Sequence, residues 1–405
     1  MSSPELRPES RPQSRPGRRV AVAGVALADC GRVDDATPHA LHAQAARRAL
    51  ADAGLGRDAV DGLASAGLGT LAPVEVAGYL GLRPRWVDST SVGGATWEVM
   101  AAHAADAIAA GHANAVLLVY GSTARSDVKA GRRTGEMSFG ARGPLQFEVP
   151  YGHSLIAKYA MAARRHMHAY GTTLEQLAQV AVQTRANAAT NPEAMFRTPI
   201  TVDDVLGGPV IADPFTRLHC CLRSDGGCAV LLVAEDLVPD CASAPVWVLG
   251  SGAYVSHTSM AGWDDFTVSP AAVSGRLAFE RAGVRPADID VAQIYDAFTY
   301  MTLVTLEDLG FCAKGEGGSF IGEGEKGRLL RDGELPTNTD GGGLSAQHPG
   351  MRGLFLIVEA VRQLRGDAGE GRQVRRRDGS PPELAVASGT GGWFCSSGTV
   401  VLGRG

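Results

Sequence analysis

The side chains best suited to proton transfer stand at two places in the second half of the chain, Tyr295 and His348. Tyr295 and Asp296 directly follow "IDVAQI", a predicted buried strand, and polar residues there are costly unless they have partners. His348 stands in a glycine-rich segment, before Pro349 and ahead of a helix predicted to start near Gly350. A phenol can take a proton from a substrate hydroxyl and return it, and an imidazole can donate to an oxyanion. The two residues therefore indicate acid–base chemistry.

Each of these residues also has a structural interpretation. A tyrosine at a strand end can pack with its hydroxyl bonded to backbone, and a loop histidine can do the same. Asp296 is expected either to cap a helix beginning at Ala297 or to accept a hydrogen bond that orients a neighbour. For Tyr295 to act as a base, nearby donors must lower its pKa from about 10.

The composition is that of an ordinary globular protein. With 405 residues, 45% of them hydrophobic, the chain can bury a large core and is expected to form two core-containing halves. The net charge of −5 gives no indication of a basic surface that would bind nucleic acid. No apolar run reaches membrane-spanning length and the start lacks a secretory signal, so no membrane association and a cytoplasmic location are expected. The seven cysteines have neither a disulfide framework's context nor a metal-ligand spacing, so no metal site is expected.

The order of predicted elements is α/β with an internal repeat. Residues 1–18 are rich in Pro and Arg and are predicted to be a disordered tail. The first half, 19–244, opens with "VAVAGVAL" and later has "AVLLVYGST" and "CAVLLVAE", and the second half, 245–405, opens with "VWVLGSGAYV" and later has "ELAVASGTGG" and "GTVVLG". Two such halves are expected to pack face to face with a site between them. Residues from about 123 to 214 are an insertion, predicted to be a loop or lid that caps the site.

Three segments together resemble the thiolase superfamily: "SDGGCAVLLVAED", "YDAFT" and "NTDGGGLSAQHPGMRGLFLIVEAVRQLRG". Within it the chain is most similar to the lipid-transfer-protein branch, related to the thiolase domain of sterol carrier protein x. The segment "YDAFTYMTLVTLEDLGFCAKGEGG" resembles the thiolase-like aldolases that cleave steroid side chains. The resemblance covers nearly everything after residue 19, and it implies a five-layered α/β/α/β/α fold made of two similar halves.

The resemblance also implies roles for particular residues. Tyr295 and His348 would be catalytic with Asp296 beside them, and substrate-binding roles fall to Asn338, Gly342, Gly343 and Gly350. Steroid aldolases usually carry a second tyrosine two residues before the histidine, and here that position is Ala346. A relay through two tyrosines is therefore not expected: either Tyr295 acts with His348 alone, or the substrate and reaction differ from steroid side-chain cleavage.

The expected nucleophile of thiolases is missing. Their reactive cysteine precedes a helix that corresponds to the predicted helix from Gly94 to Gly111, because a helix N-terminus stabilises negative charge. The sequence there is "DSTSVGGATWEVM", without cysteine. Ser91 stands near that position and would either be a nucleophile or cap the helix, but no adjacent base is identified for it. Cys395 stands near the place of a second thiolase cysteine that acts as acid and base.

The expected function is retro-aldol or aldol chemistry on a β-hydroxyacyl-CoA, carried out by Tyr295 and His348 without a nucleophilic cysteine. Thiolase-type acyl transfer and a non-catalytic scaffold that binds acyl thioesters are the alternatives. Coenzyme A enters as the substrate thioester, and no bound cofactor is expected. The resemblance further implies a homodimer and, as a partner, a small OB-fold, zinc-ribbon protein that binds acyl-CoA.

Overall fold

The computed structural model describes residues 17–69, 71–131, 143–151, 154–322 and 327–405, so most of the predicted tail lies outside the described residues. A nine-stranded sheet runs through these residues in the order β3-β2-β4-β7-β1-β8-β11-β10-β9. Its strands are β1 (Val20–Leu27), β2 (Gly62–Ala64), β3 (Trp86–Asp88), β4 (Ala115–Ser122), β7 (Gly226–Ala234), β8 (Val246–Val255), β9 (Val291–Ile294), β10 (Leu384–Gly391) and β11 (Ser396–Gly403).

The predicted repeat is confirmed by strand pairing. In the first half β1 pairs with β7 and β7 with β4 in antiparallel fashion, whereas β4 and β2 are parallel. In the second half β8 pairs with β11 and β11 with β10 in antiparallel fashion, whereas β10 and β9 are parallel. The two halves meet where β1 and β8 pair through Ala21 with Trp247 and Val22 with Val246. The strands β1, β7, β4 and β2 thus repeat the order and directions of β8, β11, β10 and β9, and β3 extends the first half by one strand.

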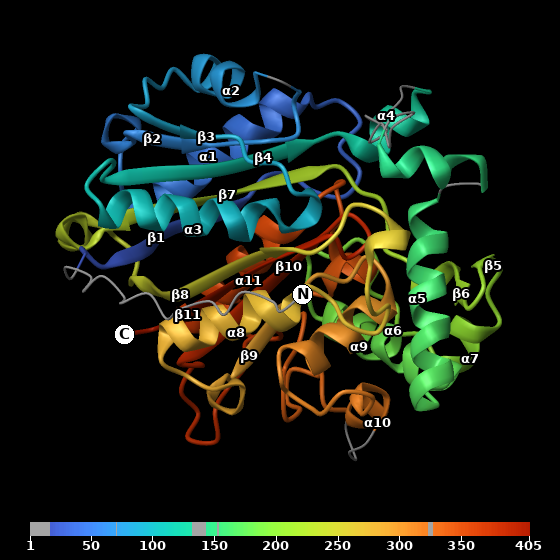
Figure 1. The fold of residues 1–405 in the computed structure, drawn as a ribbon. Coiled ribbons are helices and arrows are strands. Elements are labelled where there is room, and N and C mark those ends of the chain that lie inside the picture. The colour runs from blue at the N-terminus through green and yellow to red at the C-terminus, as the bar shows by residue number, and fades with distance from the viewer. Residues whose placement is uncertain (1–16, 70, 132–142, 152–153, 323–326) are drawn as a thin grey trace, which may run out of the picture.

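Helices complete five layers, as predicted. Helix α1 (Pro38–Ala53) packs on β1, β4 and β7, and α8 (Ala271–Ala282) packs on β8 and β11. Between the halves lie α3 (Thr96–Ala109) and α11 (Gly353–Arg365), which contact each other and strands of both halves. In Figure 1 α1 lies above α3 and α3 lies above α8, with α2 at the top of the molecule. The chain has the predicted α/β/α/β/α fold.

The remaining helices lie around this core. Helix α2 (Ala72–Leu80) lies beside α1, and the insertion contains α4 (Ala124–Lys129), α5 (Leu155–Tyr170), α6 (Leu174–Ala189), α7 (Val202–Leu206) and the small sheet of β5 (Val210–Ala212) and β6 (Phe215–Thr216). Helix α6 packs against α9 (Thr299–Asp308) and α10 (Gly317–Gly322), at the right of Figure 1. The insertion thus contacts the second half, and its role as a lid stays a prediction.

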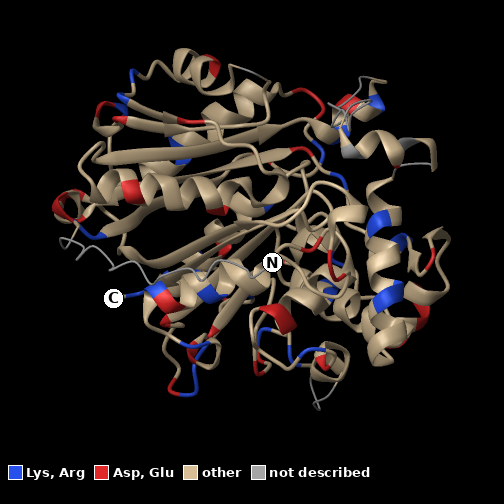
Figure 2. Ribbon diagram, in the orientation of Figure 1, with Lys and Arg blue, Asp and Glu red and all other residues tan. Residues whose placement is uncertain are grey.

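Charged side chains lie mainly outside the central strands. Figure 2 shows Lys and Arg mixed with Asp and Glu over the helices and loops, while the strands are mostly uncharged. Strands β4 and β7, for example, have almost entirely buried, apolar residues because helices cover both faces of their sheet. Within the described ranges, no helix is both long and apolar enough to cross a membrane.

Two strand glycines set how closely the outer helices approach the sheet. A Cβ added at Gly24 in β1 would overlap the Ala49 carbonyl oxygen of α1. A Cβ added at Gly252 in β8 would overlap the Ser274 carbonyl oxygen of α8. The same steric requirement therefore recurs in both halves, between the first strand and its helix.

We expect Gly24→Ala and Gly252→Ala each to lower the free energy of unfolding by about 2–3 kcal/mol, because each added methyl group forces a helix away from its strand. Urea unfolding followed by circular dichroism measures the change. Gly56→Ala is the matched control, since nothing lies within 4 Å of its added Cβ and its φ is −80°. Equal losses in all three variants would contradict this account of the packing.

Candidate active site

Tyr295 and His348 come together at the centre of the molecule. Tyr295 follows β9 directly, and its backbone N–H donates to Ser388 O of the neighbouring strand β10 at 3.0 Å. Its hydroxyl lies 3.1 Å from Nε2 of His348, and the two rings meet edge to face with 90° between their planes. The ring of Tyr295 also packs on Gly94, where an added Cβ would lie 2.6 Å from the ring carbons. The segment ahead of α3 is thus beside the Tyr295–His348 pair.

Asp296 accepts hydrogen bonds rather than capping a helix. The predicted cap at Ala297 is wrong, because α9 begins at Thr299 with Phe298 as its N-cap. The buried carboxylate instead accepts from the backbone N–H groups of Gly343 at 2.6 Å and Leu344 at 3.2 Å. Asp296 is thus an acceptor, as in the alternative prediction, and its role in catalysis stays a prediction.

The loop that contains the glycine run 341–343 needs glycine where it contacts Asp296. Gly342 has a φ of +64°, which favours glycine, and an added Cβ would overlap Oδ2 of Asp296. Gly343 presents its N–H to the same carboxylate, and an added Cβ would lie 3.1 Å from the His348 ring. The two glycines therefore allow the loop to approach both Asp296 and His348, and their predicted contact with substrate stays a prediction.

Arg352 links the two acidic residues of the site. Its guanidinium is fully buried and donates to both carboxylate oxygens of Asp340, at 2.6 and 2.7 Å, while its Nε lies 3.4 Å from Asp296. Another of its nitrogens donates to Gln347 O at 2.9 Å. Arg352 was not predicted, because only the folded chain shows that the residue four positions after His348 turns inward. It fixes both ends of the loop that presents the imidazole.

The first half of the chain also positions His348. The backbone N–H of His348 donates to Oγ of Ser224 at 3.0 Å, and Ser224 N–H donates back to His348 O at 3.3 Å. The Tyr120 hydroxyl, at the end of β4, donates to Pro349 O at 2.6 Å. Sequence reasoning missed both residues. The polar pair of Ser224 and Asp225, just before the glycines of strand β7, is the signal that marks one of them.

Burial dominates the electrostatics of the pair. It raises the pKa of Tyr295 well above 10, so the condition for Tyr295 to act as a base, a pKa lowered by nearby donors, is not met and the phenol keeps its proton. Burial and the positive Arg352 together lower the pKa of His348 to about 4, so the imidazole is neutral at physiological pH. A protonated phenol beside a neutral imidazole donates its hydrogen bond to Nε2. In the resting pair the proton therefore stays on Tyr295, and the imidazole only accepts the hydrogen bond.

Asp296 and Asp340 differ in their affinity for a proton although both lie near Arg352. Burial raises the pKa of Asp296 to about 7, and Arg352 offsets only part of that effect. Burial also disfavours the charged form of Asp340, but Arg352 outweighs it and lowers the pKa of that carboxyl. The difference follows from geometry, because Asp340 receives two short hydrogen bonds from the guanidinium.

Ser91 belongs to the segment ahead of α3 but does not cap that helix. Its side chain is exposed, and α3 begins at Thr96 with Ala95 as N-cap and no side-chain cap, so the prediction that Ser91 caps the helix is wrong. Instead the hydroxyl of Thr96 accepts from the backbone N–H of Val92 at 3.0 Å. A nucleophilic role for Ser91 stays a prediction.

Cys395 lies in the turn between β10 and β11, where its carbonyl accepts from Ser256 N–H at 2.9 Å. Burial raises its thiol pKa to about 11, which disfavours the thiolate. Its predicted role in acid–base catalysis stays untested.

Asn338 and Gly350 shape the loop from its two ends. Asn338 has a φ of +49°, and its side-chain oxygen accepts from Ile294 N–H at 2.8 Å, at the last residue of β9. Gly350 has a φ of +93° and lies beside the Tyr120 hydroxyl. Both residues therefore have clear structural functions, and their predicted contacts with substrate stay predictions. Among the described residues, no group of three or more His, Cys, Asp or Glu side chains is placed to hold a metal ion.

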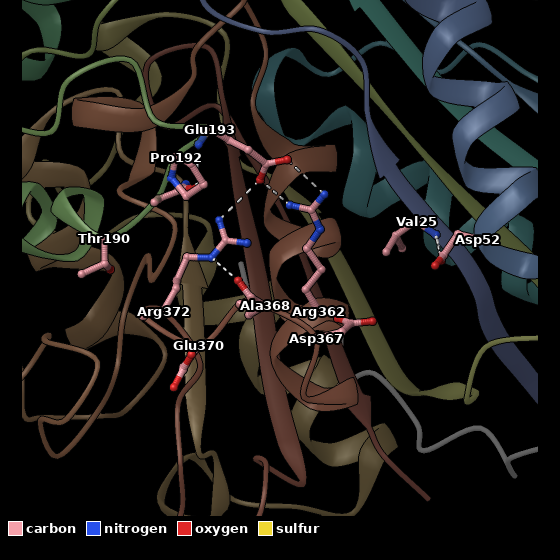
Figure 3. A pocket seen from close by; sticks show the side chains of 13 residues that line it. Val25, Asp52, Thr190, Pro192, Glu193, Arg362, Asp367, Ala368, Glu370 and Arg372 are labelled. Atoms are coloured by element: carbon pink, nitrogen blue, oxygen red, sulfur yellow. Dashed lines mark hydrogen bonds and ion pairs between the residues drawn. The ribbon is translucent and has the colours of Figure 1, made fainter.

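An open cavity of about 570 Å³ lies behind the site, lined by residues 190–193 and 367–372 with Val25, Asp52 and Arg362 (Figure 3). None of the predicted site residues lines it. Its Glu193 forms ion pairs with Arg362 at 2.6 Å and Arg372 at 3.5 Å. The Glu193 backbone carbonyl also accepts from the side chain of Gln347, the neighbour of His348. Glu193 thus connects this cavity to the loop that carries His348.

Comparisons with known proteins give a consistent assignment. Residues 252–404 match the family described as Thiolase C-terminal domain-like. A steroid side-chain-cleaving aldolase of Thermomonospora curvata is 34% identical over 382 residues, which cover 92% of this chain and 95% of that protein. The solved structure of an Ltp2-ChsH2(DUF35) aldolase has a TM-score of 0.85 at 30% identity, over 96% of this chain and 98% of that one.

Two further relatives match over shorter stretches. An acetyl-CoA acetyltransferase of Methanothermobacter thermautotrophicus is 40% identical over 231 residues, covering 56% of this chain and 59% of that protein. Bovine sterol carrier protein 2 is 34% identical over 228 residues, covering 53% of this chain and 40% of that protein. The chain therefore spans about half the length of these two relatives.

We expect Arg352→Gln to lower the free energy of unfolding by about 3–5 kcal/mol, because it leaves two buried carboxyl groups without their cation. Urea unfolding at pH 7.5 measures the loss. Arg276→Gln is the control, since Arg276 is an exposed residue of α8 whose ion pair with Glu280 contributes at most about 1 kcal/mol. An Arg352→Gln variant as stable as the control would show that the buried cation does not hold the loop.

Proposed function

The chain belongs to the sterol carrier protein branch of the thiolase superfamily, and on this premise we propose that it is an enzyme that cleaves the Cα–Cβ bond of a β-hydroxyacyl-CoA by a retro-aldol reaction. The observation that carries the proposal is the 3.1 Å contact between the Tyr295 hydroxyl and Nε2 of His348, beside a helix start without a cysteine. The aldolase names of a long relative and of a solved structure support the same reaction class.

The proton moves along the Tyr295–His348 pair. The β-hydroxyl of the substrate gives its proton to the phenol oxygen of Tyr295 while the phenol's own proton passes to Nε2 of His348. The electron pair of the O–H bond forms the new C=O bond, and the Cα–Cβ bond breaks. Its electron pair moves onto the thioester as an enolate. The enzyme thus needs no nucleophile and no bound cofactor for this step.

His348 then stabilises the charge that it helped to create. As an imidazolium it lies close to the developing enolate and lowers the barrier, because the charge exists only in the transition state and the intermediate. The same proton returns to Cα, so the products are a ketone or aldehyde and a shortened acyl-CoA. In this mechanism Tyr295 relays the proton and His348 is the base, which reverses the division of roles expected from the sequence.

Three further residues hold Tyr295 and His348 in contact with each other. Arg352 and Asp296 hold the loop from one side, and Ser224 holds the backbone of His348 from the other. A neutral imidazole is needed to accept the proton, and burial with the nearby guanidinium provides it. The relatives' names make steroid-derived acyl-CoA thioesters the first substrates to test.

Thiolase-type acyl transfer needs an activated nucleophile in the segment ahead of α3. That segment contains an exposed Ser91, no cysteine and, among the described residues, no hydrogen bond from a base to the Ser91 hydroxyl. The retro-aldol reaction uses residues that are already in contact. The scaffold alternative, which binds acyl thioesters without chemistry, is decided by whether turnover occurs.

We also propose a cytoplasmic homodimer that works with a small OB-fold, zinc-ribbon protein. Strand β3 is at an edge of the sheet and exposes Val87, which supports pairing with a second copy across a two-fold axis. The solved Ltp2-ChsH2(DUF35) aldolase is named for two components, which supports a partner of this kind.

Tyr295→Phe removes only the hydroxyl and is expected to lower kcat by about a hundredfold or more, with little change in KM, because it breaks the proton relay. Ser91→Ala is expected to leave kcat nearly unchanged. A panel of β-hydroxyacyl-CoA thioesters, analysed by mass spectrometry for a carbonyl product and a shortened acyl-CoA, measures both. Loss of activity in Ser91→Ala with normal activity in Tyr295→Phe would replace the aldolase mechanism by acyl transfer. Binding without turnover of any thioester would establish the scaffold alternative.

Light scattering is expected to give a dimer for the chain alone and a larger complex after co-expression with a small OB-fold, zinc-ribbon protein. The larger complex is expected to have a higher kcat/KM in the assay of acyl-CoA cleavage. Val87→Lys in the exposed edge strand should weaken the dimer, because like charges would face each other across the axis. A monomer at micromolar concentration under both conditions would refute the homodimer, and an unchanged mass and rate on co-expression would refute the partner.

A further inference from the structure

One buried carboxyl group at the start of α3, Glu98, has no role in the mechanism above. Glu98 is the third residue of α3, and only 1% of its surface is exposed. Neither of its carboxylate oxygens accepts a hydrogen bond from any described residue. A buried carboxylate without a donor is strongly unfavourable, whereas the neutral acid needs only an acceptor for its one proton.

Glycines from three elements form the space that the Glu98 side chain fills. An added Cβ at Gly353, the first residue of α11, would lie 2.5 Å from Oε2, and one at Gly389 in β10 would overlap the same oxygen. A Cβ at Gly398 in β11 would lie 2.8 Å from the Cβ of Glu98. The three glycines leave room for this carboxyl group and for no side chain of their own.

The carboxyl group lies next to the backbone that supports Tyr295. The Gly94 carbonyl oxygen is 2.6 Å from the same Gly353 Cβ position that lies 2.5 Å from Oε2 of Glu98. Both oxygens therefore border the same small space at the start of α11, where a proton on the carboxyl group has the Gly94 carbonyl as an acceptor. Gly94 itself is packed between the ring of Tyr295 and the Thr390 carbonyl, where no Cβ would fit.

We propose that Glu98 is a positioning residue of the active site, whose neutral carboxylic acid donates a hydrogen bond to the Gly94 carbonyl and so fixes the loop against which Tyr295 packs. This inference rests on the proposed function of Tyr295 but concerns a different group. Loss of the Glu98 proton would place a negative charge beside the Gly94 carbonyl oxygen. The loop would then move away from α11, and Tyr295 would lose its support.

The surroundings of Glu98 favour the neutral form. Burial raises the pKa of Glu98 to about 8, and its own backbone N–H offsets only part of the effect. Arg352, directly ahead of α11, is turned to Asp296 and Asp340. In β10 and β11 the hydroxyls of Ser388, Ser397 and Thr399 are neutral and bond to other hydroxyls or to backbone.

The stability of the folded chain is expected to depend on pH through Glu98. Because the folded pKa of Glu98 lies above its unfolded value of about 4.5, folding binds a proton between these values and stability falls as pH rises from about 4.5 to about 8. Above about pH 8 the folded protein carries the ionised, unsupported carboxylate. Activity that depends on the neutral acid should decline over the same upper range.

The test compares two substitutions of Glu98 that differ in hydrogen bonding. Glu98→Gln keeps the shape and a donor but cannot ionise, and Glu98→Met keeps the volume without a donor. Asp106→Asn, an exposed acid on the same helix, is the control. We expect wild-type kcat to decline with an apparent pKa near 8, Glu98→Gln to keep its rate through that range, and Glu98→Met to lose at least tenfold at every pH. An equal loss in Gln and Met, or an alkaline decline that survives in Gln, would overturn the proposal.

A second measurement needs no turnover and separates this inference from the retro-aldol proposal. Hydrogen–deuterium exchange of a peptide covering residues 88–97, corrected for the intrinsic rate at each pH, reports how firmly the loop is held. We expect protection to fall in the wild type above about pH 8, to persist in Glu98→Gln and to be low in Glu98→Met throughout. Protection that is the same in all four proteins would overturn the positioning role even if the enzyme is an aldolase.

Discussion

The site depends on one buried cation, Arg352, held between Asp340 and Asp296. A guanidinium without water is unfavourable unless carboxylates surround it, and the two carboxylates are equally unfavourable without the guanidinium. The contact therefore fixes Asp296 at the end of β9 relative to the start of α11. Everything between these points, including the glycine loop and His348, is placed by that requirement. Tyr295, the neighbour of Asp296, receives its position from the same contact.

The two halves of the repeat contribute unequally to the site. Both titrating partners of the proposed relay come from the second half, while the first half supplies neutral contacts, the Ser224 hydroxyl, the Tyr120 hydroxyl and the backbone of Gly94. This division follows from the layers. The starts of α3 and α11 meet between the two parts of the sheet, and a helix start offers backbone N–H groups and space when its first residues are glycines.

Much of the fold could be read from the sequence because strand periodicity and the repeat are local signals. The strands beginning at Val20, Ala115 and Val246 lie where the apolar segments predicted them. Tyr295 and His348 could be found because their residue types stand in unusual contexts. Arg352, Ser224 and Glu98 could not, since an arginine, a serine and a glutamate are ordinary at any surface position. What distinguishes them is burial, and burial of a single side chain depends on the packing of segments distant in sequence.

The joint between the halves has a mechanical consequence. Strands β1 and β8 share only the pairs Ala21 with Trp247 and Val22 with Val246, whereas the pairs within each half are far more extensive. The nine-stranded sheet thus has two extensively paired parts that are joined by only two residue pairs. Helices α3 and α11 pack between these two parts, so their side chains set the angle between them. A change in the side-chain volume between α3 and α11 would change the angle between the two parts of the sheet. That change would act at the contact between Gly94 of the first half and Tyr295 of the second half. The spacing at the proposed site therefore depends on packing in the interior of the molecule and not on its surface loops.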